Sequence, residues 1–239
     1  MIDITTTATL RPELYEQSLR SLVEHVAGDF RLLINIDPVG PGNADAVEAV
    51  ARKYMSRVEA FRPETANFQI AQLRLWHAVD SEFFFNMEDD WEILVDVDMA
   101  AMLTVMRQRP DLALLRLPRW ESHKFTRQWN KWKIPFNGQF FELPEELRGN
   151  LGFSGHPSLI RREFLRPMAE RLNPEYDLEK QMKRPGQFGQ YLFAWSYGIW
   201  QKQEAPATIK DIGTPWRRDN KWYKAGPTKH KWTTWVKMD

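Results

Sequence analysis

The stretch EFFFNMEDDWE, residues 82–92, decides the fold class of this chain. An aromatic, apolar run typical of a buried strand leads directly into three carboxylates, Glu88, Asp89 and Asp90. Carboxylates crowded at one strand end repel each other, and their pKa values rise unless a cation neutralises them. Oxygen ligands at this spacing suit Mg²⁺ or Mn²⁺. The alternative interpretation is an acidic helix N-terminus, stabilised by the helix dipole.

The segments around this stretch alternate between strand-like and helix-like patterns. Runs of β-branched and apolar residues predict strands, and apolar residues at helical spacing predict helices. The predicted strands are residues 2–9, 30–37, 57–61, 82–87 and 111–119. The predicted helices are residues 11–26, 44–55, 66–79 and 98–109. Alternation through about residue 118 is typical of an α/β fold, in which helices cover both faces of a mostly parallel sheet.

The second half of the chain is less regular. Residues 119–150 are aromatic, basic and loop-like. Further predicted elements are strands at 151–160 and 191–201, a helix at 162–172 and the start of another element at 177–183. The tail from Asp211 is predicted to be irregular, basic and rich in tryptophan. The length fits one large domain, 1–239, whose two halves are residues 1–118 and 119–239.

The composition excludes several classes of protein. With 43% apolar residues and ordinary charge content, the chain is expected to be globular rather than disordered or fibrous. It contains no apolar run long enough for a membrane span and no signal-like start, so we expect a cytoplasmic protein. The absence of cysteine excludes disulfides, thiolate metal sites and a cysteine nucleophile.

The net charge of +1 conceals an asymmetry. Residues 1–110 contain 10 Lys and Arg against 18 Asp and Glu, a balance of −8, whereas residues 111–239 contain 23 against 14, a balance of +9. An acidic half beside a basic half suggests a site that handles a metal on one side and a polyanion on the other. Unevenly distributed, solvated surface charge is the simpler alternative.

Two apolar strands end in acidic residues. Asp37 closes the strand at 30–37, and Glu88 to Asp90 follow the strand at 82–87. Ligands of open α/β sheets bind beyond the carboxyl ends of the strands. On these features, the first 115 residues resemble the nucleotide-sugar half of a glycosyltransferase of the GT-A fold. The segment NMEDDWE, residues 86–92, resembles a Glu-Asp-Asp-Trp variant of the Asp-x-Asp motif found in small, family 2-like bacterial and phage glycosyltransferases.

This resemblance implies a set of donor contacts. Residues near the nucleoside and phosphates of a nucleotide-sugar, with a UDP-sugar as the first expectation, would be Thr5, Thr6, Thr7, Asp37, Arg62, Arg74 and Asp89. An exposed helix face explains Arg74 equally well. Mn²⁺ or Mg²⁺ bridging the donor diphosphate would be held by Asp90, helped by Glu88 or Asp89. Such an ion offsets charge on the departing nucleoside diphosphate.

The resemblance also implies an acceptor side in the second half. A displacement at a sugar carbon needs a base for the acceptor hydroxyl, and Asp177 and Glu179 in LNPEYDLEKQMKR are the candidates, with Glu179 preferred. Direct displacement by this route inverts the anomeric centre. His156 in SGHPSLI could line the acceptor pocket. An ordinary helix start for DLEK and a structural histidine are the alternatives.

The tail after Asp211 interleaves basic residues with Trp and Tyr. It could track nucleic-acid phosphates and stack bases. It could equally form a lid over the donor, in which His230 contacts the metal and Lys231 the diphosphate. Tryptophans that pack on the core while their charged neighbours face water are the third possibility.

The leading hypothesis is a metal-dependent, inverting hexosyl- or pentosyltransferase. A hydroxymethylated base in phage DNA, modified in the host cytoplasm, is the preferred acceptor, ahead of a surface or lipid-linked glycan. A sugar nucleotidyltransferase would need a glycine-rich phosphate loop after the first strand, which TTTATLRPE (residues 5–13) lacks. A non-catalytic nucleic-acid-binding protein is the remaining alternative, and the oligomeric state stays open.

Overall fold

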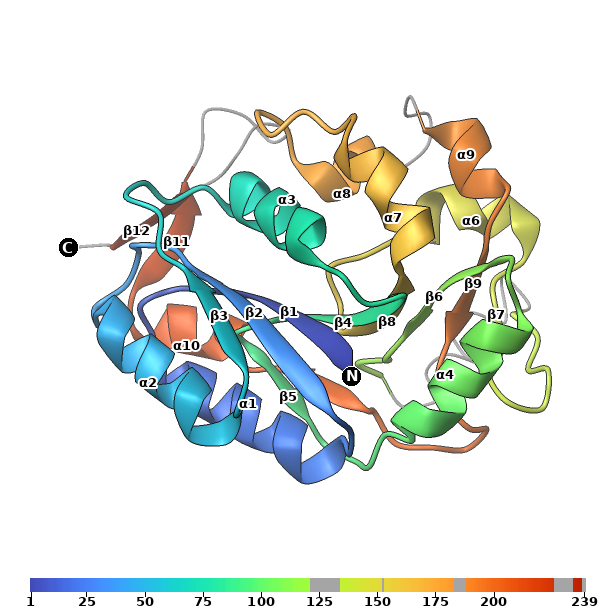
Figure 1. Cartoon of the computed structure of the whole chain (residues 1–239), viewed down its shortest axis with the longest axis horizontal. Helices are drawn as coiled ribbons and strands as arrows, with labels where there is room; N and C mark the ends of the chain where they lie inside the picture. The colour runs from blue at the N-terminus through green and yellow to red at the C-terminus, as the bar shows by residue number, and fades with distance from the viewer. Residues whose placement is uncertain (121–133, 152, 183–187, 226–233, 238–239) are drawn as a thin grey trace.

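The computed structural model describes residues 1–120, 134–151, 153–182, 188–225 and 234–237 (Figure 1). Its first half alternates strand and helix as the sequence predicts. The elements are β1 (Ile2–Ala8), α1 (Pro12–His25), β2 (Phe30–Ile36), α2 (Ala44–Tyr54), β3 (Val58–Phe61), α3 (Phe68–Ala78), β4 (Phe83–Glu88), β5 (Trp91–Ile93), α4 (Met99–Gln108) and β6 (Leu112–Arg116). Because β5 is a strand, the acidic stretch does not begin a helix.

An eight-stranded sheet in the order β3-β2-β1-β4-β8-β6-β9-β7 forms the centre of the molecule. Strands β1 to β4 pair in parallel, and so do β6 and β9 (Ser196–Ile199). Strand β8 (Ser158–Arg161) lies antiparallel between β4 and β6, and β7 (Phe141–Glu142) is antiparallel to β9. The predicted α/β fold with a mostly parallel sheet is confirmed, and strands from both halves of the chain share the sheet.

Helices cover both faces of this sheet, as Figure 1 shows. Helices α1, α2 and α4 pack on one face, and α3 and α7 (Arg162–Ala169) on the other. The side chains of β4 alternate accordingly, with Phe83 and Phe85 in the first core and Phe84 in the second. This two-sided burial explains why strands such as β4 are continuously apolar.

The second half contains more regular structure than the sequence predicts. The predicted strand at 151–160 is β8 alone, and the predicted strand at 191–201 is the end of a helix followed by β9. The tail contains a helix and three strands where irregular structure is predicted. Helix α8 (Leu178–Gln181) is the element whose start is predicted at 177–183. The additional elements are α6 (Glu145–Leu151), α9 (Gly189–Phe193), β10 (Ile209–Asp211), α10 (Gly213–Asp219), β11 (Trp222–Ala225) and β12 (Thr234–Lys237).

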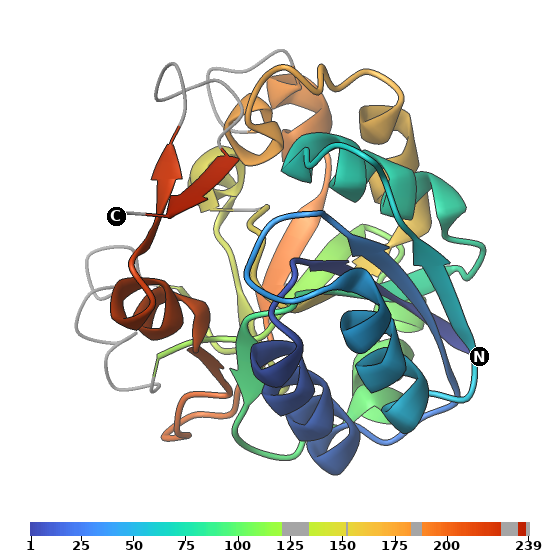
Figure 2. The ribbon, with the colours of Figure 1, turned by 90° about the vertical axis from the view of Figure 1, so that its left-hand side faces the viewer.

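The tail elements return to the first half of the chain. Strand β10 pairs antiparallel with β5, so that Asp211 lies opposite Trp91. Helix α10 follows at once, and β11 and β12 form a hairpin. Figure 2 shows α10 and the hairpin, in red, together on one side of the molecule. The pairing of β10 with β5 therefore brings α10 to the residues that follow β4.

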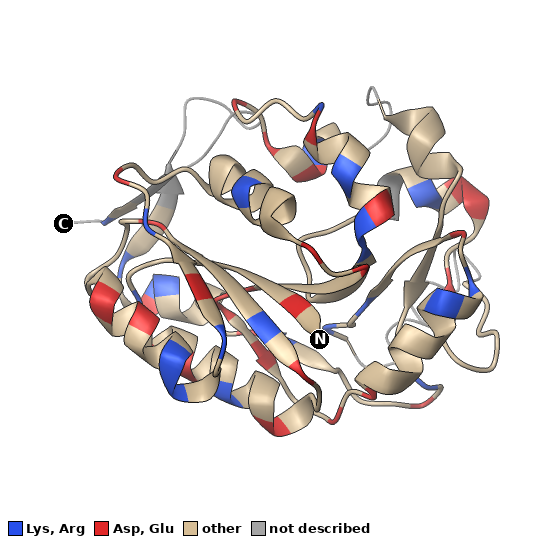
Figure 3. Ribbon diagram, in the orientation of Figure 1, with Lys and Arg blue, Asp and Glu red and all other residues tan. Residues whose placement is uncertain are grey.

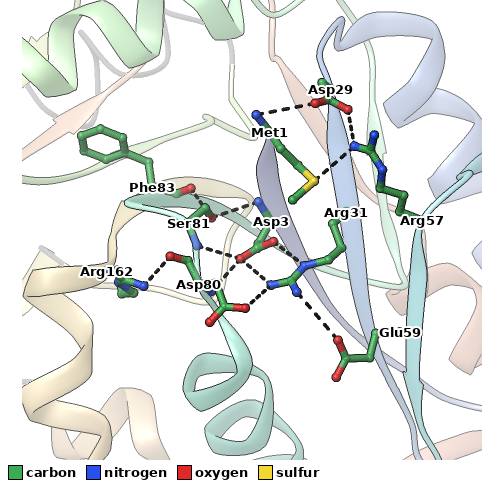
Figure 4. A network of polar contacts seen from close by, with 10 residues as sticks. All are labelled: Met1, Asp3, Asp29, Arg31, Arg57, Glu59, Asp80, Ser81, Phe83 and Arg162. Atoms are coloured by element: carbon green, nitrogen blue, oxygen red, sulfur yellow. Dashed lines mark hydrogen bonds and ion pairs between the residues drawn. The ribbon is translucent and has the colours of Figure 1, made fainter.

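A polar network closes the amino ends of the central strands (Figure 4). Buried Asp3 accepts hydrogen bonds from Arg31 Nε at 2.8 Å and from the backbone N–H groups of Asp80 and Ser81 at 2.8 and 2.9 Å. Burial alone would raise the pKa of Asp3, but these bonds hold it below its usual value. The network ties β1, β2 and the turn before β4 together at the end of the sheet where the strands begin.

Candidate active site

A pocket of about 670 Å³, open mouth included, lies at the carboxyl ends of β1, β2 and β4. Its lining combines strand ends, the start of α3 and one residue of α10. The lining residues are Thr7, Ala8, Thr9, Arg11, Asp37, Val39, Ala66, Asn67, Phe68, Glu88, Asp89, Asp90 and Arg217. The Thr7 hydroxyl is buried and has no hydrogen-bond partner within the described residues, so a ligand in the pocket could satisfy it.

Asp89 is fully engaged by protein groups. Its Oδ1 accepts a 2.6 Å hydrogen bond from Arg11 Nη2, and its Oδ2 accepts from the backbone N–H of Thr9 at 2.9 Å and from the Thr9 hydroxyl at 3.1 Å. Both partners of the ion pair are about 5% exposed. Burial lowers the pKa of Arg11, but the carboxylates of Asp89 and Asp90 raise it above its usual value. This pair therefore holds the β4 end against the start of α1.

Asp90 is buried but less tightly held. Its Oδ2 lies 3.5 Å from both Arg11 Nη2 and Arg217 Nη1. Its backbone oxygen accepts from the N–H of Ile212 at 2.9 Å. Burial raises the pKa of Asp90 to about 6, the charge of Asp89 acts in the same direction, and Arg11 opposes it. A buried carboxylate in this state gains from an additional cation.

Asp37 forms the opposite wall of the pocket. Its Oδ1 accepts from Asn35 Nδ2 at 2.8 Å, and Arg74 donates to the Asn35 side-chain oxygen. Burial raises the pKa of Asp37 to about 6, although Asn35, Arg74 and the backbone N–H of Asn67 oppose the rise. Asn67 also caps α3, since its side chain accepts from Ile70 N–H at 3.1 Å. A buried carboxylate acceptor thus lines the same pocket as the exposed side chain of Phe68 at the start of α3.

The residues present allow a divalent cation with few protein ligands. Within the part of the chain that the structure describes, no group of three or more His, Cys, Asp or Glu side chains could hold a metal alone. Both oxygens of Asp89 already accept hydrogen bonds from Arg11 and Thr9, so among the three carboxylates after β4 we take Asp90 and Glu88 as the candidate ligands. Mg²⁺ is commonly held by one or two carboxylates plus substrate phosphates, so this donor set fits an ion that arrives with a diphosphate.

Residues of the second half adjoin the pocket at Glu88. A Cβ added to Gly155 would lie 2.8 Å from Glu88 Oε1, so the loop before β8 touches that carboxylate. The neighbouring His156 ring packs edge-on against Trp91, with centroids 5.0 Å apart. Arg116, the last residue of β6, donates to Ser154 Oγ at 3.1 Å. The structure therefore brings the predicted acceptor-side histidine beside the acidic stretch.

The two candidate bases have different surroundings. Asp177 caps α8, because its side chain accepts from the N–H of Lys180 at 3.0 Å, and it pairs with Lys180 Nζ at 3.1 Å. Glu179 lies within α8, and its carboxylate favours the charged form of Arg116. The interpretation of DLEK as a helix start describes Asp177, whereas the charge of Glu179 acts on Arg116 at the end of β6.

Several residues of the predicted donor site lie outside the pocket. Thr5 and Thr6 are buried in β1, and the Thr5 hydroxyl donates to Asn86 Oδ1 at 3.1 Å. Arg62 pairs with Asp45 and Glu48 on the surface. Arg74 bonds to Asn35, and its charge acts on Asp37. His230 and Lys231 lie outside the described residues. Of the predicted donor-side positions, the structure gathers Thr7, Asp37, Glu88, Asp89 and Asp90 around one pocket.

Among the pocket residues that the sequence analysis missed, three contact the carboxylates after β4. Arg11 and Thr9 hold Asp89, and Arg217 reaches Asp90 from α10. The sequence does contain a feature that indicates Arg11: it is a basic residue directly before Pro12, which starts α1. Because β1 ends at Ala8, a residue at this position lies close to the end of β1. Arg217 forms a contact across more than 120 positions, and the motif RR at 217 and 218 alone does not reveal it.

Comparisons with known proteins identify the fold. No protein-family model matches the chain, and a search of curated proteins finds no match. Among solved structures, S. aureus TarS 1-349 is 14% identical, with a TM-score of 0.56 over 87% of this chain and 59% of that chain. Mannosyltransferase PcManGT from Pyrobaculum calidifontis, in complex with GDP-Man and Mn²⁺, is 12% identical, with a TM-score of 0.53 over 69% and 46%.

A third similar structure is a CMP:2-keto-3-deoxy-manno-octonic acid synthetase complexed with CTP. It is 12% identical, with a TM-score of 0.52 over 92% of this chain and 97% of that chain. At these identities the likeness shows the fold, which is the GT-A fold of glycosyltransferases. The chain spans about three fifths of TarS 1-349. In the described part of the chain, no helix is both long and apolar enough to cross a membrane.

Proposed function

We propose that this protein is a metal-dependent glycosyltransferase that moves a sugar from a nucleotide-sugar to an acceptor hydroxyl. The observation that carries the proposal is the pocket, in which Asp37, Glu88 and Asp90 meet beyond the ends of parallel strands in a GT-A fold. The similar TarS and PcManGT structures include complexes with UDP, UDP-GlcNAc and GDP-Man with Mn²⁺, which supports this class of donor. A UDP-sugar is our first candidate.

The charge of the pocket supports a requirement for a cation. Asp37, Glu88, Asp89 and Asp90 carry four negative charges when ionised, and Arg11 and Arg217 carry two positive ones, which leaves −2. The diphosphate of a nucleotide-sugar adds two negative charges, and a buried excess of that size is costly. Asp90 and Glu88 would hold Mn²⁺ or Mg²⁺, which when bound stabilises negative charge on the departing nucleoside diphosphate.

Other residues of the chain have separate roles in substrate binding and catalysis. Asp37 accepts a hydrogen bond from the nucleobase, and the unpartnered Thr7 hydroxyl bonds to the nucleoside. Arg217 lies at the metal side of the pocket, where its guanidinium can donate to a phosphate oxygen. Glu179 takes the proton of the acceptor hydroxyl, and direct displacement inverts the anomeric centre. Asp89 contacts no substrate and positions Asp90 through the Arg11 ion pair.

The acceptor is proposed from charge. Described basic residues of the tail include Lys210, Arg218, Lys221 and Lys237, and the second half carries an excess of +9. In the first half of the chain, acidic and basic positions are interspersed on elements such as α2 (Figure 3). A hydroxymethylated base in DNA is our preferred acceptor, and a glycan is the alternative. DNA binding should strengthen as salt falls; no binding of duplex or single-stranded DNA at low salt would remove this acceptor.

A sugar nucleotidyltransferase is the second candidate, because the CTP-bound synthetase matches this chain over nearly its whole length. Against it, the segment after β1 has no glycine, and its basic residue, Arg11, is bound to Asp89 rather than open to a triphosphate. The two activities release different products. A glycosyltransferase releases a nucleoside diphosphate from a nucleotide-sugar, whereas a nucleotidyltransferase releases pyrophosphate from a nucleoside triphosphate and a sugar.

The test is a product assay with a panel of nucleotide-sugars and Mn²⁺, run beside a panel of nucleoside triphosphates with sugars and sugar phosphates. We expect diphosphate release from at least one nucleotide-sugar and no pyrophosphate release. Pyrophosphate release alone would replace the proposal with the second candidate. A protein without turnover that still binds DNA after neutralisation of Glu88, Asp89 and Asp90 would be a non-catalytic nucleic-acid-binding protein.

A further inference from the structure

The loop from Ser154 to His156 connects the two sides of the site. Ser154 Oγ accepts from Arg116 Nη1 at 3.1 Å. Gly155 approaches Glu88 so closely that a Cβ at this position would lie 2.8 Å from its carboxylate. His156 packs on Trp91 at 5.0 Å between centroids. A shift of this loop would therefore move groups on the donor side.

Arg116 is fixed at the other end of this connection. It ends β6, and it pairs with Ser158 of β8 on one side and with Ile199 of β9 on the other. Its backbone oxygen also accepts from Trp200 N–H at 2.9 Å. The residue is only 8% exposed, so its guanidinium has little freedom. A strand end held on both edges is a rigid base for a functional side chain.

The charge of Glu179 acts on this guanidinium. Burial lowers the pKa of Arg116 to about 10; the charge of Glu179 opposes this, and that of Arg119 adds to it. Glu179 lies on α8, which the buried Leu178 and Met182 anchor to the core. The guanidinium at the end of β6 thus bonds to the loop that contacts Glu88 and interacts electrostatically with a candidate base on α8.

We propose that Arg116 is a positioning residue of the reaction: it holds Glu179 and the 154–156 loop in a fixed relation to Glu88. This inference rests on the proposed function. Arg116 contacts no reacting atom, and its effect is on the geometry in which Glu179 meets the acceptor hydroxyl. A displacement of about 1 Å in such geometry can lower a rate about 100-fold.

The test compares Arg116→Gln and Arg116→Lys with the matched control Arg161→Gln. Arg161 likewise ends a strand, β8, and is 6% exposed, but it bonds the carbonyls of Met106, Arg109 and Leu112 beneath α4, away from the pocket. For each variant we would measure thermal stability, calorimetric UDP affinity with Mn²⁺, and hydrolysis of the UDP-sugar that the wild type cleaves fastest, with water as the acceptor.

We expect Arg116→Gln to lower kcat about 10- to 100-fold with UDP affinity within about twofold of wild type, because the donor side keeps its ligands. Arg116→Lys, which retains the charge, should recover part of kcat. Arg161→Gln should lower thermal stability and leave kcat unchanged. If Arg116→Gln fails to fold, Arg116→Lys provides the test, since it should lower kcat more than UDP affinity.

Two results would overturn the inference alone: Arg116 variants with wild-type kcat, or a parallel fall of kcat, UDP affinity and stability like that of a purely structural residue. A wild-type protein that binds no UDP and hydrolyses no donor would instead refute the proposed function, and the inference would fail with it.

Discussion

Asp89 and Asp90 are adjacent in the chain but differ in what surrounds their carboxylates. Asp89 accepts from Arg11 and Thr9, whereas Asp90 meets two guanidinium groups only at 3.5 Å. Removing one partner of a buried ion pair leaves the other charge uncompensated. Adjacent carboxylates that look equivalent in the sequence therefore have separate roles, one in stability and one at the pocket.

This difference predicts that two substitutions change the free energy of unfolding by different amounts. Asp89→Ala should lower the free energy of unfolding by about 3 kcal/mol or more, because Arg11 loses its partner inside the protein. Asp90→Asn should leave it within about 1 kcal/mol of wild type, since an amide avoids the cost of a buried charge. Urea unfolding of both variants measures this. Equal destabilisation by the two substitutions would show that the carboxylates are interchangeable supports.

The raised pKa values of Asp37 and Asp90, both about 6, predict a pH dependence with opposite signs for stability and for binding. Between the unfolded pKa near 4 and the folded value near 6, the native state binds more protons than the unfolded state, so these two groups make the ligand-free protein less stable as pH rises through this window.

Binding should change in the other direction. A cation at Asp90 must displace its proton, so Mn²⁺-dependent UDP affinity should fall up to about tenfold per pH unit below pH 6 for each displaced proton. Calorimetric titrations from pH 5 to 8, beside thermal melts without ligand, check both signs. UDP affinity that is flat across this range would contradict the assignment of Asp37 and Asp90 to the ligand site.

At the scale of elements, the start of α10 packs directly against Asp90, the second residue after β4. A Cβ at Gly213, the first residue of α10, would lie 2.0 Å from Asp90 Oδ2. Gly213→Ala should therefore displace Asp90 or α10 and lower Mn²⁺-dependent UDP affinity at least tenfold. Gly189→Ala is the matched control, because Gly189 also begins a short helix and a Cβ there meets no atom within 4 Å. Its affinity should equal that of wild type, and the same loss in both variants would exclude the contact as the cause.

At the opposite end of the sheet, the network around Asp3 is expected to stabilise the fold and to have no effect on UDP binding. Asp3→Ala removes the acceptor shared by Arg31, Asp80 and Ser81, and it should lower the free energy of unfolding by about 2–4 kcal/mol without changing UDP affinity. Because the folded pKa of Asp3 is lowered, its contribution is present above pH 4 and is lost as pH falls through the folded value. Acid unfolding of wild type and variant checks this; curves that remain parallel below pH 4 would contradict it.

At the scale of the whole molecule, periodicity in the sequence was sufficient for the parallel half of the fold. Strands β2 and β4 contribute side chains to the cores on both faces, which makes them largely apolar and places Asp37 and Glu88 at ends that the sequence already marks. The insertion of β8 between β4 and β6 and the return of β10 to β5 depend on pairings between distant segments. Local pattern does not encode such pairings, so α10 and Arg217 could not be placed at the pocket in advance.

The same distinction applies to the site. Strand-end carboxylates indicated where a ligand would bind, because the carboxyl ends of parallel strands meet at one edge of the sheet. Which of them remain available to it depends on Arg11 and Arg217, whose contacts with Asp89 and Asp90 span 78 and 127 positions. In the sequence, Arg62 looked available for a donor phosphate. In the structure it pairs with Asp45 and Glu48 of the preceding helix, α2, and local sequence pattern does not reveal this pairing.

The central claim is that this pocket binds a nucleoside diphosphate together with a divalent cation at Asp90. Its most direct test is calorimetric titration of UDP, the diphosphate of our first candidate donor, into wild type and Asp90→Asn at pH 7.5, each with Mn²⁺ and with a chelator. The account predicts that wild type binds UDP at least about tenfold more tightly with Mn²⁺, and that Asp90→Asn binds equally weakly in both conditions. Equal affinity of wild type with and without the ion, or full Mn²⁺ enhancement in Asp90→Asn, would contradict it.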